Sequence, residues 1–222
     1  MKYTLTLIAI FITIYQSCSS QATYNNKPVT KRDTVFENAF SQIDSNLFYF
    51  PTKFFREGSD LPAYKNFRVN WYSKQLIALK EPIIFSDTSK KEIYRFTWLR
   101  SFHNPIAIRI ERLGNDFKVY WKLCNGAGGY APGKLIIDRQ KVIDKSDWDE
   151  FIKLLDQIDY WKLNTIEQTF GTDGAEWIIE GKKLNQYQVV DRWTPNHGSK
   201  YYLCCDFLIK LTGLRIAEKY KY

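Results

Sequence analysis

Strict alternation of apolar and polar side chains constrains this chain more than any other feature. Residues 106–111 and 117–123 each send every second side chain to an apolar face, and Leu113–Asp116 separates them as a turn. A period of two is typical of a β-strand with one face on a core and the other in water. The pattern therefore predicts an antiparallel hairpin in the middle of the chain.

The turn also sets the register of this hairpin. A turn over Leu113–Asp116 pairs Glu111 with Lys118 and Arg109 with Tyr120. Opposite charges, and a cation beside an aromatic ring, are favourable cross-strand neighbours. We expect both pairs on the solvated face of the sheet.

Other segments show strand patterns bounded by turn residues. The patterns predict strands over 67–72, 75–79, 83–85, 93–99 and 134–138, and a second hairpin over 175–193. Because strands cluster together and the clearest helices come late in the chain, the sequence indicates an α+β fold. We expect a mainly antiparallel sheet of hairpins with two helices from the C-terminal half packed on it.

Three segments have helical periodicity. A short helix is expected over Val35–Phe50. A second begins at Ser146, where Asp149 completes a capping-box start. The third covers Lys200–Leu211 and ends near Gly213; it is apolar nearly all round, which predicts burial against the sheet and the second helix.

The chain begins with a lysine and an apolar run that is too short to span a membrane. This pattern is typical of a secretory signal, here residues 1–17. Residues 15–18 resemble a bacterial lipobox with an atypical Tyr15, which predicts a lipid anchor on Cys18. Ordinary cleavage after Ala22 is the alternative. Residues 18–35 then form a polar tether, and residues 36–222 a single α+β domain.

The formal net charge of +8 comes from scattered Lys and Arg residues rather than from one basic block. Without a block or a motif, nucleic acid is not an expected partner. In an envelope, a basic protein meets anionic lipid headgroups and cell-wall polymers. The expected partners are therefore the membrane, through the lipid on Cys18, and an envelope protein or glycan.

Cysteine and histidine are too few to suggest metal or redox chemistry. The sequence has no Cys-x-x-Cys and two histidines, so no metal site and no cofactor are predicted. Cys124, Cys204 and Cys205 are expected to be buried free thiols. A disulfide bond from Cys124 to Cys204 or Cys205 is the alternative.

Candidate catalytic groups are few. His103 and His197 occupy loops, and with Asp191 they could form a base or a metal site if the loops met. Glu176 and Glu180 share one strand face, as on an ordinary solvated edge. The glycine-rich stretch 125–130 lacks phosphate-loop spacing and is expected to be a structural turn. The common hydrolase signatures are absent.

Aromatic residues make up 17% of the chain, and several lie beside arginines. Tryptophan, tyrosine and arginine together commonly build binding faces for sugars, peptides or proteins. The candidate binding face consists of Trp98, Arg100, His103, Tyr130, Trp177, Arg192, Trp193 and His197. Filling of the core is the alternative role for each tryptophan.

Several short stretches resemble a group of uncharacterised bacterial envelope lipoproteins. These stretches are Tyr94–His103, Gly126–Tyr130, Pro132–Leu135, Trp148–Phe151, Asp173–Gly181 and Val189–Trp193. The resemblance is one of hairpins and turns, and it implies an envelope location without implying an activity or a functional residue.

Three functions follow as hypotheses. The first is a non-enzymatic cell-envelope lipoprotein whose folded domain binds a partner or ligand. The second is an envelope hydrolase that uses His103, His197 and nearby acids. The third is an immunity or inhibitor lipoprotein that blocks a toxin.

Overall fold

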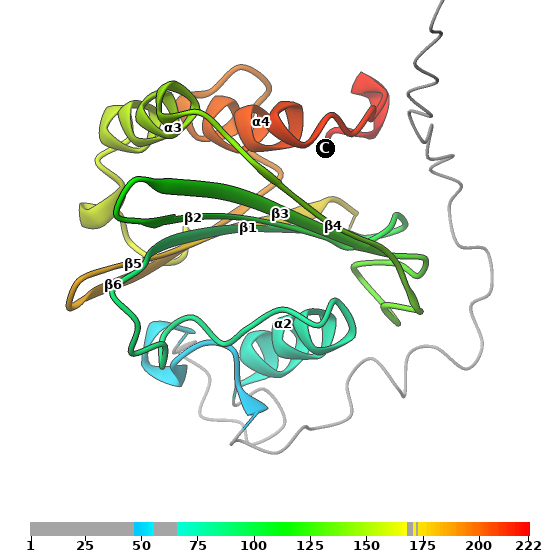
Figure 1. The fold of residues 1–222 in the computed structure, drawn as a ribbon. Helices are drawn as coiled ribbons and strands as arrows, with labels where there is room; N and C mark the ends of the chain where they lie inside the picture. Colours follow the sequence, from blue (N-terminus) through cyan, green and yellow to red (C-terminus); the bar gives the residue numbers. More distant parts are fainter. Residues whose placement is uncertain (1–46, 56–65, 168–170, 172) are drawn as a thin grey trace, which may run out of the picture.

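The computed structural model describes residues 47–55, 66–167, 171 and 173–222 (Figure 1). In chain order its elements are η2 (Thr52–Phe55), α2 (Phe67–Ala78), β1 (Glu92–Arg100), β2 (Ile106–Leu113), β3 (Asp116–Cys124), β4 (Leu135–Val142), α3 (Lys145–Gln157), η3 (Tyr160–Lys162), β5 (Ala175–Lys183), β6 (Gln186–Trp193), α4 (Lys200–Thr212) and η4 (Glu218–Tyr220). The signal, the tether and nearly all of the helix expected over 35–50 lie outside the described residues.

The strands form one antiparallel sheet in the order β4-β3-β2-β1-β5-β6. Helices cover both of its faces, so the fold has three layers: α3 and α4 lie on one side, and α2 lies on the other (Figure 1). The predicted α+β class with an antiparallel sheet of hairpins and two helices of the C-terminal half on it is confirmed.

The α3–α4 side of the sheet carries the larger apolar core. Alternate side chains of β1, β2, β3 and β5 point into it, and α3 contributes Trp148, Phe151 and Leu155. The two helices pack against each other as well as on the sheet. Burial of this apolar surface is the main stabilising contribution on that side.

Helix α2 replaces two of the predicted strands. Its buried positions Val69, Tyr72 and Leu76 are spaced by three and four residues, which is helical spacing. The aromatic and β-branched residues of this segment favoured the strand interpretation. Packing of the buried side chains on the sheet stabilises the helix instead. The predicted strand over 83–85 is also wrong, because residues 81–85 form an irregular connection.

The predicted hairpin is confirmed with its register: Glu111 pairs with Lys118, and Arg109 with Tyr120. The Arg109 guanidinium lies 4.2 Å from the centre of the Tyr120 ring. The predicted solvated face is wrong for Arg109, Glu111 and Lys122, which are buried, whereas Lys118 is exposed as expected and Tyr120 is half-buried. The connection between α2 and β1 covers this face, and Glu111 binds Arg109 and Lys91 there.

The helix ends differ in how well the sequence predicted them. Helix α3 has Asp144 as its N-cap without a side-chain hydrogen bond, so the capping box at Ser146 is wrong. Asp149 lies inside the helix and binds Lys145 at 2.5 Å. Helix α4 follows the prediction: it ends at Gly213, which adopts the left-handed conformation (φ 76°) that favours glycine.

The three cysteines of the described region are free and buried, as expected. Cys204 and Cys205 lie in the core under α4, whereas Cys124 belongs to the cluster on the α2 side of the sheet. Within the described ranges, no helix is long and apolar enough to cross a membrane.

Candidate functional site

Two tryptophans on neighbouring strands form the centre of the candidate site. Trp98 of β1 pairs with Trp177 of β5, and their ring centres are 4.8 Å apart. Both side chains are fully buried, so each indole N–H needs an acceptor within the protein. Both find the same one: the main-chain oxygen of Tyr222 accepts from Trp98 at 3.1 Å and from Trp177 at 2.9 Å.

Arg100 and His103 complete this arrangement at the end of β1. The Arg100 guanidinium lies 4.3 Å from the centre of the Trp98 ring and donates to the main-chain oxygen of Tyr220 at 3.3 Å. His103 Nδ1 lies 2.6 Å from the Tyr222 hydroxyl. We call Trp98, Trp177, Arg100 and His103 the aromatic seat, and residues 214–222 the tail.

Burial sets the protonation state of the seat. Loss of water, aided by the positive charge of Arg100, lowers the pKa of His103 to about 4. Burial also raises the pKa of the Tyr222 phenol. At neutral pH the contact is therefore between a neutral imidazole and a neutral phenol.

The glycine-rich turn holds His103 in place. The Gly128 N–H donates to the His103 main-chain oxygen at 2.9 Å, and its own oxygen accepts from Trp71 of α2 at 2.8 Å. A Cβ at Gly128 would lie 2.6 Å from the Leu99 Cα, so only glycine fits this close approach. The turn is structural, as its spacing indicates.

Ion pairs hold the outer side of the tail. Lys221 binds the buried carboxylate of Asp206 in α4 at 2.7 Å, and Glu218 at the same distance. Glu218 also lies 3.3 Å from the exposed His197. Leu214 and other apolar tail side chains pack against the core of the α3–α4 side.

The remaining predicted site residues lie outside the seat. Arg192 donates to the main-chain oxygens of Asn164 and Thr165, and its guanidinium faces Tyr201. Trp193 is half-buried, and the half-buried Tyr130 stacks on Phe102. All of these contacts are with other residues of the same chain, outside the aromatic seat.

The candidate residues therefore do not form one exposed face. Trp98, Trp177 and Arg100 are completely buried, and His103 is nearly so. Four of the eight predicted residues lie together, and the tail that covers them gave no signal in the sequence. His103 and His197 touch different tail residues, and no contact joins them to each other or to Asp191 among the interactions of the described residues.

A second polar cluster lies on the α2 side of the sheet. The Glu81 carboxylate lies 2.9 Å from Arg109, 3.4 Å from Lys122 and 3.6 Å from Arg95. Arg95 also binds Glu180, which was expected on a solvated edge and is buried instead. These charges lose water under α2 and its connection to β1, so each must be paired.

The carboxyl groups of Glu176 and Asp191 interact with each other on the α2 side of the sheet. Burial, and then the charge of Asp191, raise the pKa of Glu176 well above its usual value. Arg68 lies 2.9 Å from Asp191 and 3.1 Å from Glu176, and the Tyr72 hydroxyl donates to Asp191 at 2.7 Å. The other oxygen of each carboxyl is buried without a partner, which a proton on Glu176 would correct.

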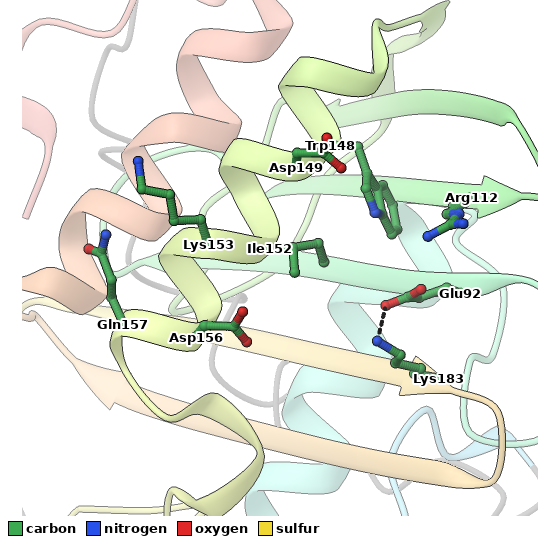
Figure 2. A pocket seen from close by; sticks show the side chains of 9 residues that line it. All are labelled: Glu92, Arg112, Trp148, Asp149, Ile152, Lys153, Asp156, Gln157 and Lys183. Atoms are coloured by element: carbon green, nitrogen blue, oxygen red, sulfur yellow. Dashed lines mark ion pairs between the residues drawn. The ribbon is translucent and has the colours of Figure 1, made fainter.

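Two pockets lie on opposite sides of the sheet. One, of about 500 Å³, lies between α3 and the strands; in Figure 2 the Glu92–Lys183 ion pair faces the polar side chains of α3. Its acids and bases are mixed, and Trp148 is buried beneath it. The other, of about 460 Å³, is lined by the Glu81 cluster. Its buried charges already bind one another.

The described residues contain no group of three or more His, Cys, Asp or Glu side chains placed to hold a metal ion. The acids of the α2 side are engaged with arginine and lysine, and the seat histidine is engaged with tyrosine. What the seat does in this structure is hold the tail of the same chain: it donates hydrogen bonds to main-chain oxygens and packs against tyrosine rings.

Sequence analysis missed the residues that complete both clusters. Tyr220 and Tyr222 gave no periodic signal, although two tyrosines flanking a lysine are an aromatic-basic pattern. Glu81 and Arg95 were not recognised as partners, because Arg95 lies inside the predicted strand over 93–99 and Glu81 lies between two other predicted strands. No protein-family model matches the chain, and no curated protein is similar to it.

The carboxyl pair yields a matched pair of substitutions. Glu176→Gln replaces a protonated carboxyl by a neutral amide, and we expect the free energy of unfolding at pH 7 to change by less than about 1 kcal/mol. Asp191→Asn removes the charge that Arg68 and Tyr72 bind, and should cost about 2 kcal/mol. Urea unfolding measures both, and equal losses for the two variants would contradict the assignment.

His103 predicts a pH dependence of stability. Its pKa is about 4 in the folded chain and about 6.5 in the unfolded chain. Between these values the unfolded state binds more protons, so stability falls as the pH falls from 6.5 towards 4.

The comparison variant is His103→Asn, which keeps a polar group near Nδ1 and does not titrate. Between pH 7 and pH 4.5 the original chain should lose about 2 kcal/mol more than the variant, as measured by thermal or urea unfolding. Parallel curves for the two proteins would show that His103 is not buried as a neutral group.

Proposed function

We propose that this chain is a non-enzymatic cell-envelope lipoprotein, exported by residues 1–17 and anchored through a lipid on Cys18, whose folded domain binds a partner. The export signal and the lipobox-like residues support the location. The observation that carries the binding role is the aromatic seat, where buried donors converge on the main chain of a peptide segment.

Several features favour binding over hydrolysis. A general base works best with a pKa near the working pH, whereas the pKa of His103 is about 4 and its Nδ1 faces the Tyr222 hydroxyl. His197 is exposed beside Glu218. Buried tryptophan and arginine, in contrast, are the residues that dominate binding energy at protein interfaces.

The anchor is tested by mass spectrometry of the N-terminus from membrane and soluble fractions. We expect an acylated Cys18 in the membrane fraction and its loss in Cys18→Ser. Cys124→Ala is the matched control, because it removes a buried cysteine outside the leader and should leave the chain on the membrane. An unmodified N-terminus at Thr23 in the soluble fraction would contradict the anchor.

The binding role is tested in the cells that produce the anchored chain. A photo-crosslinking residue at the exposed position Lys219, beside the seat, should capture one discrete partner. The same residue at Lys141, on the exposed edge strand β4, is the control and should not. Identical patterns at the two positions would count against a partner at the seat.

A further inference from the structure

The aromatic seat requires an occupant. If the tail leaves, the indole N–H groups of Trp98 and Trp177 lose their common acceptor, the main-chain oxygen of Tyr222. With the tail in place both indoles are fully buried. In an open seat water reaches these donors, but any segment that covers the seat again must supply an acceptor, because a buried donor without a partner is strongly unfavourable. The seat therefore selects a group that can supply the same oxygen.

The contacts specify which kind of group that is. Two of the tail's main-chain oxygens, those of Tyr220 and Tyr222, accept from the seat, and any peptide carries such oxygens. The side-chain contacts are more selective. His103 packs against the Tyr220 ring at 4.9 Å and meets the Tyr222 hydroxyl at 2.6 Å.

The residue between the two tyrosines is also recognised. Lys221 reaches the buried carboxylate of Asp206 in the middle of α4, which also binds Lys210 one turn further on. A buried acid beside the seat favours a cation at this position. The recognised pattern is thus tyrosine, a basic residue, tyrosine, with the first tyrosine at the end of the 3-10 turn η4.

The tail is held in a way that allows it to leave. It joins no strand of the sheet, and its regular structure is one 3-10 turn, η4. As whole residues, 218 and 219 are exposed and 220–222 are half-buried, whereas the Lys221 side chain is only 8% exposed. A short segment that lies outside the sheet and the main helices can open locally below the free energy of global unfolding.

We propose that the aromatic seat is a recognition site for a peptide of the tyrosine–basic–tyrosine type, that the tail occupies it in the free protein, and that a partner's segment of this chemistry replaces the tail. The proposal rests on the binding function proposed above and names its partner class. Because the tail is tethered, its effective concentration at the seat is of millimolar order, so it competes strongly.

The test uses the purified full chain and a fluorescent peptide with the sequence of residues 218–222, Glu-Lys-Tyr-Lys-Tyr, followed by fluorescence polarisation. Tyr222→Ala removes the tail's hydroxyl and ring contacts at this position and so weakens the hold of the tail on the seat. We expect this variant to bind the peptide about tenfold more tightly than the original chain, because the fraction of molecules with an open seat rises.

Two controls accompany this measurement. Lys219→Ala changes an exposed tail residue that makes no contact with the seat, and should bind the peptide like the original chain. A peptide with alanine in place of both tyrosines should not bind. In nuclear magnetic resonance spectra of Tyr222→Ala, the tyrosine peptide should shift the indole N–H signals of Trp98 and Trp177.

Equal peptide affinity for the original chain and Tyr222→Ala would overturn the proposal, and so would binding that leaves both indole signals unchanged. If near-ultraviolet circular dichroism shows that Tyr222→Ala is unfolded, Tyr222→Phe replaces it. That variant keeps the ring, loses the hydroxyl contact with His103, and should gain a few-fold in affinity; no gain would overturn the proposal. The lipid anchor is decided separately by the mass of the N-terminus.

Discussion

Coverage of both faces of the sheet is the constraint on which the rest of this structure depends. An antiparallel sheet often keeps one face in water, where polar side chains need no partner from the protein. Here α2 covers the second face, so Arg95, Glu180 and Glu81 lose water and bind one another. On the opposite face, the indole N–H groups of Trp98 and Trp177 also lose water, and they donate to a main-chain oxygen of the tail.

Local patterns predicted the parts of the fold that local interactions decide. The hairpin register follows from its turn and from the Arg109–Tyr120 pair, and α4 ends where Gly213 permits a left-handed residue. Helix α2 could not be predicted in this way. Its Val69 and Tyr72 favour strands intrinsically, and only the sheet against which they pack stabilises the helix.

The same limit applies to the candidate site. Sequence analysis placed Trp98, Arg100, His103 and Trp177 in a larger group of eight residues, because aromatic residues and arginine are typical of binding faces. It placed them on the surface, since no local signal shows that a tail more than a hundred residues after β1 lies over Arg100. Charged residues such as Glu180 were likewise assigned to water, and their burial depends on cations from distant segments.

Hydrogen exchange of the Trp98 and Trp177 indole N–H groups, followed by nuclear magnetic resonance in the unmodified chain, tests the central claim most directly. If the tail is the replaceable occupant of the seat, both groups exchange slowly and together, with an opening free energy well below that of global unfolding. Exchange at the rate of a free indole would show that the tail does not cover the seat. Exchange through global unfolding alone would show that the tail is a fixed part of the core.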